Sequence, residues 1–388
     1  MKIVYIIKSF ANKAGTERII CDKINYLAEK GHAITLVTYE QGNHSFAFSL
    51  HPSVCYVDLN TRFFIANQLP IYKRAFCLLK LRKQFKSRLQ KRIDEINPDI
   101  IISTTYSIDL INIILSVKSR ARMIVESHVA CFSIKKSYEK RRYPVIRILA
   151  FLYDSFMFRT LGRCDAFVSL TKGDASDWEK YIPNVTVIPN FATMFPECLP
   201  SYEGVHHRII AVGRLHVQKG FDMLIDAFSM VAERIPAWQL CIFGSGGDEQ
   251  FLKQRIREYK LDERIHILAP TDNIYEEYQS SDFFVLSSRY EGFGLVLVEA
   301  MSCGIPCVAF GCKYGPEEII EDGKNGLLVE NGNVKEFAEK MLWMIRHREE
   351  RLQMGKQARK DVRKYELNAI MPKWHELFES LMKQSKIQ

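Results

Sequence analysis

Apolar residues along this chain gather in short runs, each followed by a helical segment or a polar loop. The first half holds five such runs, at Lys2–Ile7, Ala33–Thr38, Ile100–Ser103, Met123–Val125 and Ala166–Leu170. The second half holds six, at Arg208–Val212, Gln239–Phe243, Ile265–Leu268, Phe283–Leu286, Pro306–Ala309 and Gly326–Val329. Short apolar runs that alternate with helical patterns are typical of parallel strands buried on both faces. The pattern therefore predicts an α/β fold with two Rossmann-like, doubly wound sheets.

The length favours two domains, because 388 residues exceed the size at which a single core stops growing. Residues 190–206 separate the two series of runs, contain several prolines and lack periodicity, so they form the predicted hinge. We predict an N-terminal domain at 1–190 and a C-terminal domain at 191–365, with a cleft between them. The final segment, 366–388, has one apolar helical face that carries Met371, Trp374, Leu377, Phe378 and Leu381.

The cysteine spacing and the lengths of the apolar runs argue against a metalloprotein, a secreted protein and a membrane-spanning protein. The ten cysteines show no paired CxxC spacing, so Cys303, Cys307 and Cys312 are predicted to be core thiols, and neither a metal nor a cofactor is expected. The N-terminal apolar run is too short for a signal peptide, and no apolar stretch reaches 18 residues. These features favour a cytoplasmic protein with reduced thiols.

Positive charge is concentrated in the first half of the chain. Residues 1–190 contain 29 basic and 16 acidic residues, whereas residues 191–388 contain 25 and 29. The stretch from Tyr72 to Arg92 holds nine Lys or Arg, no acid and an apolar stripe at helical spacing. Such a helix can lie on anionic lipid headgroups, or it can be a solvated crossover helix whose stripe is core. We favour the membrane surface, since no recognition motif supports a nucleic-acid partner.

Two carboxylates flank a glycine-rich turn in the second half. Glu291 is followed by Gly292, Phe293, Gly294 and Leu295, and Glu299 comes eight positions after Glu291. The apolar run before them predicts a strand, and Gly292 to Gly304 runs at helical spacing, which would place Glu299 about two turns along a helix. The amides at a helix start suit a diphosphate, and a carboxylate accepts ribose hydroxyls well. This arrangement predicts a nucleotide-sugar site.

The chain resembles glycosyltransferase family 4, whose members have the GT-B architecture and a Glu, seven residues, Glu element in this setting. The resemblance covers nearly the whole chain and implies that Glu291 faces the donor sugar and that Glu299 holds the nucleotide ribose. It also implies that the last helix crosses back to brace the N-terminal domain. The alternative is that Glu291 is a helix-cap carboxylate and Glu299 a solvated helix acid.

Two cations follow the first strand of the second half. Gly213, Arg214 and Leu215 are followed by Lys219 and Gly220, a pattern that resembles the residues with which the family grips the diphosphate. An Arg and a Lys at this place can stabilise a departing nucleoside diphosphate without a metal ion. The alternative is a lysine on a surface loop.

Two glycine positions complete the predicted donor site. Gly15 follows the first strand and resembles part of a Gly-Gly-Ala-Glu-Arg element of the family, although Ala14 stands where the first glycine is common. Gly244 opens a Gly-Ser-Gly-Gly turn that is expected to close around the base or the diphosphate. This turn does not match a dinucleotide fingerprint.

Glu126-Ser-His128 follows the fourth predicted strand, at the sheet edge where ligands collect. The family commonly has Ser-Glu-His there, so the resemblance implies that His128 contacts the donor sugar or the acceptor hydroxyl. We predict a positioning residue, because the front-face mechanism implied by the family needs no dedicated protein base. A structural histidine is the alternative.

Together these features and the resemblance predict a metal-independent glycosyltransferase on the inner face of the membrane, and the family implies transfer with retention at the anomeric carbon. The expected donor is a hexose or N-acetylhexosamine on a nucleoside diphosphate, with UDP as the expected nucleotide, and the acceptor is a lipid-linked or other glycan. A nucleotide-sugar epimerase of the same architecture and a catalytically silent sugar-nucleotide-binding protein are the alternatives. The loops at 42–62 and 130–143 show no pattern that selects one sugar or acceptor.

Overall fold

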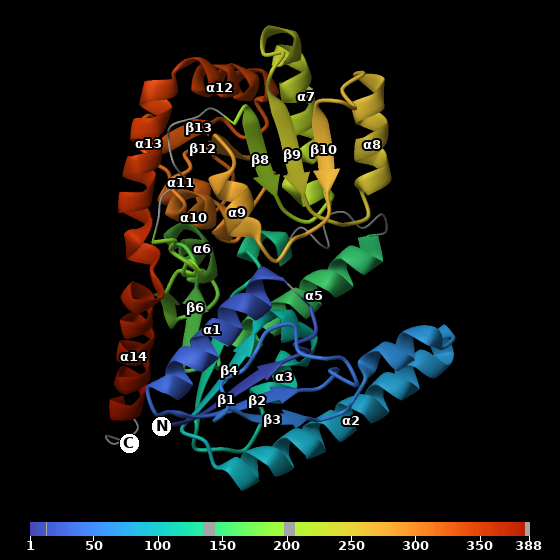
Figure 1. The fold of residues 1–388 in the computed structure, drawn as a ribbon. Helices are drawn as coiled ribbons and strands as arrows, with labels where there is room; N and C mark the ends of the chain where they lie inside the picture. The colour runs from blue at the N-terminus through green and yellow to red at the C-terminus, as the bar shows by residue number, and fades with distance from the viewer. Residues whose placement is uncertain (13, 135–143, 198–205, 385–388) are drawn as a thin grey trace. The chain divides into compact units, whose positions relative to one another are not determined.

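The computed structural model describes residues 1–12, 14–134, 144–197 and 206–384 (Figure 1). Lys13, part of the predicted hinge and most of the 130–143 loop lie outside these ranges. The chain forms two compact units. The N-terminal unit comprises Met1–Ile188 together with Met371–Gln388, and the C-terminal unit comprises Pro189–Ile370.

The N-terminal unit is built on a parallel sheet of seven strands in the order β3-β2-β1-β4-β5-β6-β7. The strands are β1 (Lys2–Ile7), β2 (Ala33–Thr38), β3 (Cys55–Asp58), β4 (Ile100–Thr104), β5 (Arg122–Glu126), β6 (Ala166–Ser169) and β7 (Val185–Val187). The α-helices are α1 (Gly15–Glu29), α2 (Ile71–Ile96), α3 (Ile111–Ile114), α5 (Pro144–Leu161), α6 (Lys172–Trp178) and α14 (Leu367–Gln384). Short 3-10 helices occur at η1 (Phe63–Gln68) and η2 (Thr105–Leu110).

The C-terminal unit is built on a parallel sheet of six strands in the order β10-β9-β8-β11-β12-β13. The strands are β8 (Arg208–Val212), β9 (Gln239–Phe243), β10 (Ile265–Leu268), β11 (Phe283–Leu286), β12 (Cys307–Phe310) and β13 (Gly326–Val329). The α-helices are α7 (Phe221–Val231), α8 (Glu249–Glu258), α9 (Ile274–Gln279), α10 (Leu295–Ser302), α11 (Pro316–Ile319), α12 (Val334–Arg346) and α13 (Arg348–Asp361). The 3-10 helices are η3 (Val217–Lys219), η4 (Ala232–Arg234) and η5 (Val362–Tyr365).

Helices cover both faces of each sheet, so the predicted doubly wound α/β fold is confirmed (Figure 1). Every predicted strand is present within about one residue of its expected position. The sequence analysis missed the two edge strands of the first sheet, β3 and β7. Neither strand contains a buried residue, so neither carries the apolar run that marks the central strands.

The helix after Glu291 is shorter than predicted. It begins at Leu295, because Gly294 stands at its N-cap with φ of +87°, outside the helical region. Glu299 therefore lies one turn into the helix, and the prediction of about two turns was wrong. The turn that precedes the helix is correspondingly longer.

The segment after Ile188, which begins the predicted hinge, is tied to other parts of the C-terminal unit. The Ala192 amide donates to the Tyr365 carbonyl oxygen at 2.9 Å, and the Ser302 hydroxyl donates to the Met194 carbonyl oxygen at 3.1 Å. Within the described ranges no helix is both long enough and apolar enough to cross a bilayer.

Candidate active site

The carboxyl edge of the C-terminal sheet contains a topological switch point. From β8 the chain continues to β9 and β10 on one side, whereas β11 leads to β12 and β13 on the other side. The loops after β8 and β11 therefore leave in opposite directions, and ligands of open α/β sheets bind at such a place. Arg214 and Lys219 follow β8, and Glu291 follows β11, so the fold brings all three to this edge.

Lys219 and Glu291 form an ion pair across the switch point. The Lys219 ammonium donates to Glu291 Oε1 at 2.6 Å, and the Ser288 hydroxyl donates to the same oxygen at 2.6 Å. The Lys219 side chain is 14% exposed and the Glu291 side chain 8%, so the pair is largely buried and keeps a small exposed fraction. The Glu291 backbone is held on both sides, by the Lys313 carbonyl oxygen and the Tyr314 amide.

A second ion pair joins the loop after β11 to the first turn of α7. Arg289 makes two parallel hydrogen bonds to the Asp222 carboxylate at 2.8 and 2.6 Å, the strong bidentate arrangement. Burial opposes ionisation of Asp222, but the bonds and charge of Arg289 hold its pKa below the ordinary value. The Ser287 hydroxyl also donates to the Lys219 carbonyl oxygen at 2.9 Å. These bonds fix the backbone from which Lys219 and Glu291 project.

Two glycines let the loops approach closely. A Cβ at Gly244 would lie 2.0 Å from the Gly213 carbonyl oxygen, so the turns after β8 and β9 can pack only without a side chain there. Gly220 has φ of +63°, and a Cβ would lie 2.1 Å from the Ser287 carbonyl oxygen. The structure thus gives Gly220 and Gly244 a packing role at the predicted donor site, and Gly213 supplies the carbonyl oxygen that Gly244 approaches.

Glu299 lies on α10 beside the buried side chain of Tyr278. The Tyr278 hydroxyl donates to Glu299 Oε2 at 3.3 Å, and burial together with the Glu299 charge raises the pKa of Tyr278 well above its ordinary value. Gly292 and Phe293 form the turn before the helix, and the first amides of α10 follow from Leu295. Helix-start amides of this kind lack intrahelical acceptors and can bind an anion.

The N-terminal unit carries a buried array at the corresponding edge of its sheet. The Lys23 ammonium donates to Glu126 Oε1 at 2.6 Å, and His128 Nε2 lies 3.2 Å from Glu126 Oε2. The side chains of Lys23, Glu126 and His128 are only 2%, 2% and 3% exposed. The imidazole of His128 is therefore turned inward, and its backbone amide donates to Thr105 Oγ1 at 2.9 Å.

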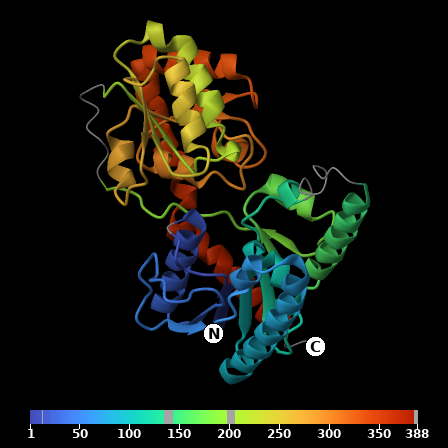
Figure 2. The same ribbon diagram turned by 90° about the vertical axis from the view of Figure 1, so that its right-hand side faces the viewer.

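The C-terminal helix covers this array. The Lys23 ammonium lies 3.8 Å from the ring centre of Trp374, a residue of α14, and 5.6 Å from that of Tyr5 on β1. Figures 1 and 2 show α14 running beside α1 within this unit. Burial lowers the pKa of Lys23, and Glu126 offsets part of this effect. Burial alone would raise the pKa of Glu126, but Lys23 and His128 bring it below its ordinary value.

The start of α1 lies near His128. Gly15 is the first residue of α1, and the Thr16 hydroxyl donates to the Tyr106 hydroxyl at 3.4 Å. The Tyr106 ring stacks on His128, with ring centres 6.1 Å apart and planes inclined by 11°. These residues follow β1, β4 and β5, which are adjacent strands at the switch point of this sheet.

Family models match nearly the whole chain in two parts. The model "Glycosyltransferase Family 4" matches residues 14–193, and the model "Glycosyl transferases group 1" matches residues 206–361. The chain belongs to glycosyltransferase family 4. This enzyme is therefore a glycosyltransferase, as the sequence resemblance implied.

Two curated relatives align over almost the full length of this glycosyltransferase. An uncharacterised glycosyltransferase of Haemophilus influenzae is 27% identical over 96% of this chain and 98% of its own. The amylovoran biosynthesis glycosyltransferase AmsD of Erwinia amylovora is 27% identical over 97% of this chain and 99% of its own. Among solved structures, Staphylococcus aureus TarM superposes with a TM-score of 0.77 at 16% identity, covering 97% of this chain and 99% of TarM. That likeness supports the GT-B fold.

Some site features of the glycosyltransferase were not predicted from sequence. Arg214, Lys219 and Glu291 were predicted together, but the Arg289–Asp222 pair and Ser288 were not. Lys23 was also missed, although it lies on the apolar side of α1 between Ile20 and Leu27, where a charge needs a buried partner. The position of Lys23 among the apolar residues of α1 was the sequence feature that could have predicted a buried ion pair.

The cysteine cluster consists of buried thiols, as predicted. Cys303, Cys307 and Cys312 are buried, and burial raises the thiol pKa of Cys303 to about 12. No group of His, Cys, Asp and Glu side chains within the described residues has the arrangement of a metal site.

Proposed function

We propose that this glycosyltransferase transfers a hexose or N-acetylhexosamine from a nucleoside-diphosphate sugar to a lipid-linked or other glycan in polysaccharide biosynthesis. The observation that carries the proposal is the Lys219–Glu291 pair at the switch point of the C-terminal sheet. A cation and a carboxylate held 2.6 Å apart can address a diphosphate and a sugar hydroxyl of one ligand.

The proposed donor is a UDP-sugar. TarM was solved with UDP and α-GlcNAc-glycerol. A Staphylococcus aureus relative, 31% identical over 51% of this chain and 40% of its own, is named poly(ribitol-phosphate) alpha-N-acetylglucosaminyltransferase. The Erwinia relative is named for the biosynthesis of a polysaccharide, amylovoran. These names support a UDP-sugar donor and a glycan acceptor for the present enzyme.

The four charged residues of the predicted donor site each receive a role in this proposal. Arg214 and Lys219 stabilise the negative charge that develops on the departing nucleoside diphosphate, so the reaction needs no metal ion. Glu299 accepts the ribose hydroxyls, and Glu291 orients the donor sugar. We propose that the acceptor hydroxyl attacks the anomeric carbon from the face that the nucleoside diphosphate leaves, so the transfer proceeds with retention. The departing phosphate takes the acceptor's proton, so no dedicated protein base is needed.

In this proposal His128 is a positioning residue of the N-terminal unit. Its ring is fixed by Glu126 and stacked on Tyr106, so its backbone and neighbouring loop keep one conformation. Glu126 is in turn held by Lys23. His128 therefore orders the end of β5, and proton transfer is left to the substrate phosphate.

We further propose that the enzyme works on the cytoplasmic face of the membrane, where a lipid-linked acceptor is available. The support is α2, whose basic stretch from Tyr72 to Arg92 matches an anionic lipid surface.

The donor assignment is tested by calorimetric binding of UDP, GDP and ADP to the full chain. We expect selective binding of UDP, weakened at least tenfold in both Lys219→Ala and Glu299→Ala, followed by slow hydrolysis of one UDP-sugar. Lys335→Ala and Glu339→Ala, two exposed changes on α12, serve as matched controls and should bind like the wild type. Wild-type protein that binds none of the three nucleotides at millimolar concentration would overturn the assignment.

A further inference from the structure

Large apolar side chains are exposed on two helices of the N-terminal unit. On α2, Tyr72, Phe76 and Leu79 are 74%, 74% and 69% exposed, although Phe85 and Leu89 of the same helix are buried in the core. The predicted stripe therefore divides, and its second half is core. Phe76 and Leu79 follow Tyr72 by four and seven positions, so the three share one face. A soluble helix normally buries such a face.

A similar face occurs on α5, which the sequence analysis did not single out. Ile148, Phe151, Leu152 and Phe156 are between 57% and 61% exposed, and their spacing places them on one side of the helix. The opposite side packs inward through Met157, Phe158 and Leu161. Both faces of α5 are therefore apolar, but only one is covered by the protein.

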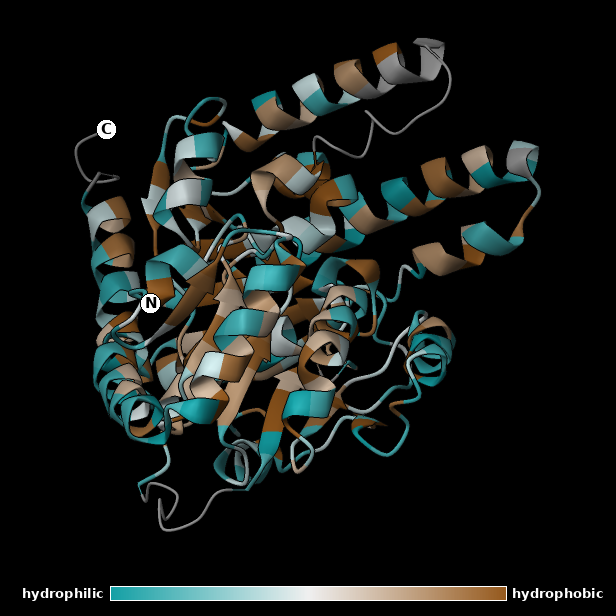
Figure 3. Ribbon diagram, turned by 90° about the horizontal axis from the view of Figure 1, so that it is seen from above, coloured by the Kyte–Doolittle hydropathy of each residue, from teal (hydrophilic) through white to brown (hydrophobic). Residues whose placement is uncertain are grey.

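The two helices meet at Asp109. Arg82 of α2 donates to the Asp109 carbonyl oxygen at 2.8 Å, and the Tyr153 hydroxyl of α5 donates to the Asp109 carboxylate at 3.2 Å. Figure 3 shows both helices extending on the same side of the unit, with apolar residues along each. Both helices are therefore tied to Asp109 and lie on one side of the unit.

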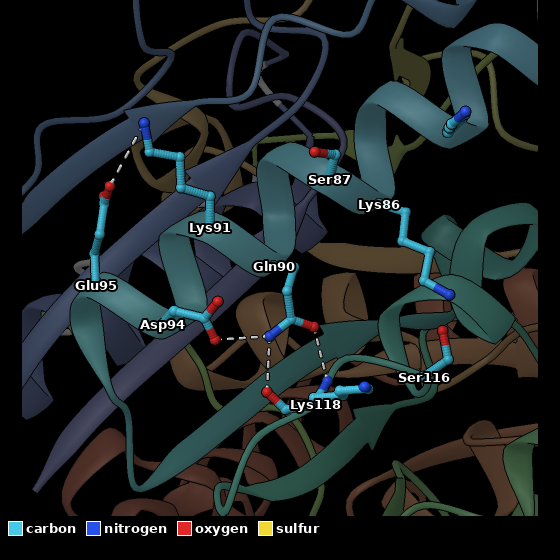
Figure 4. A pocket seen from close by; sticks show the side chains of 9 residues that line it. Lys86, Ser87, Gln90, Lys91, Asp94, Glu95, Ser116 and Lys118 are labelled. Atoms are coloured by element: carbon cyan, nitrogen blue, oxygen red, sulfur yellow. Dashed lines mark hydrogen bonds and ion pairs between the residues drawn. The ribbon is translucent and has the colours of Figure 1, made fainter.

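Basic side chains lie among the apolar ones on α2. Lys73, Lys80, Lys83 and Lys86 are exposed, and the first acidic residue of the helix is Asp94. Beyond Leu79 the same helix face enters an open groove, where Figure 4 shows Lys86 directed toward Ser116 with Lys118 nearby. The groove also contains Asp94 and Glu95, and Glu95 is paired with Lys91 and Arg92. The apolar residues of the first turns and the lysines that follow them match the acyl boundary and the headgroups of an anionic bilayer.

We propose that α2 and α5 form one docking surface for a bilayer that contains anionic lipid. The docking surface comprises the exposed apolar residues of both helices and the four lysines of α2. A second copy of the chain fits it poorly, because a twofold contact brings the same lysines against each other. The inference deepens the proposed membrane contact of α2 by adding α5, and it rests on no assumption about the sugar.

The test is co-sedimentation of the full chain with vesicles of phosphatidylcholine, with and without about 30% phosphatidylglycerol, at about 0.1 M salt. We expect binding only to the anionic vesicles. Phe76→Ser with Leu79→Ser, and separately Phe151→Ser with Phe156→Ser, should each weaken it about tenfold or more. Lys80→Gln with Lys83→Gln should weaken it about fivefold per charge.

The matched control is Met230→Ser with Phe251→Ser, which removes apolar residues of 55% and 53% exposure from the C-terminal unit and should leave vesicle binding unchanged. UDP binding on the same preparations checks folding and tests the donor site separately. Three results would overturn the proposal: no wild-type binding to anionic vesicles, an α5 variant that binds like the wild type, or a wild-type dimer that either apolar variant dissociates.

Discussion

Two lysine–glutamate pairs have the same 2.6 Å separation and stand at the carboxyl edges of the two sheets, but their surroundings differ. Lys219 and Glu291 remain partly exposed, whereas Lys23 and Glu126 are closed off beneath Trp374. The small exposed fraction of the Lys219–Glu291 pair leaves its charges within reach of a ligand. A buried pair serves no ligand, but removing one partner leaves an uncompensated charge. The same type of ion pair can therefore serve ligand binding in the C-terminal unit, whereas in the N-terminal unit it stabilises the folded conformation.

The substitution Lys23→Met should have the largest effect on stability, and it tests the structural role of the buried pair. Glu126 would then stay buried with His128 as its remaining partner, and we expect a loss of about 3–5 kcal/mol in the free energy of unfolding. Urea denaturation, with hydrogen exchange of β1 and β5 to localise the effect, measures it. Adding Glu126→Leu should restore most of the stability, because no buried charge is left; a double variant as unstable as the two single losses combined would contradict the account.

The next largest effect concerns activity. Lys219→Met should lower kcat about 10²- to 10³-fold, as expected for loss of one group that stabilises developing charge. Its loss of unfolding free energy should be smaller than that of Lys23→Met, since this pair is less deeply buried and Ser288 still donates to Glu291. Initial rates with the UDP-sugar identified above and urea denaturation give the two values. Equal losses of stability in Lys219→Met and Lys23→Met would remove the distinction between the pairs.

The turn after β9 has no room for a side chain at Gly244. Gly244→Ala should cost about 1–3 kcal/mol in stability and weaken UDP binding, because the new Cβ meets the Gly213 carbonyl oxygen. Gly247→Ala in the same turn is the control, since its Cβ would meet nothing within 4 Å. Thermal denaturation and calorimetry of both variants provide the measurement, and equal behaviour of the two would show that the close approach does not matter.

The smallest effect is a pH dependence of the buried pair. The folded-state pKa of Glu126 lies below its ordinary value of 4.5, so the unfolded chain binds the proton more readily. This contribution to stability is present above about pH 4.5 and is lost as the pH falls through the folded pKa. Glu126→Gln should therefore show a shallower loss of unfolding free energy on acidification than the wild type. Identical slopes would contradict the shift.

The central strands and the donor residues were predictable because each depends on local patterns. A buried parallel strand is a continuous apolar run, and Arg214, Lys219 and Glu291 stand just after such runs. The edge strands β3 and β7 lack that signal, since neither has a buried residue. The Lys23–Glu126 contact joins residues 103 positions apart, and no spacing rule links a helix face to a strand end at that distance.

The exposed half of α2 illustrates a second limit of prediction from sequence. The apolar stripe from Phe76 to Leu89 is continuous in sequence, yet Phe85 and Leu89 pack against the sheet while Phe76 and Leu79 do not. Periodicity shows which face is apolar but not where the neighbouring sheet ends. On α5 apolar residues occur on both sides of the helix, so periodicity could not indicate which side is exposed.

The cover that Trp374 places over Lys23 has a consequence for synthesis of the chain. The N-terminal unit is completed by residues from Met371 onward, which leave the ribosome after the whole C-terminal unit has been made. At about 5–20 residues per second this delay is roughly 10–40 s. During that interval Trp374 is not yet available to cover Lys23. The N-terminal unit is therefore synthesised first but completed last. A nascent chain stalled before Met371 should expose the region around Lys23 to proteases.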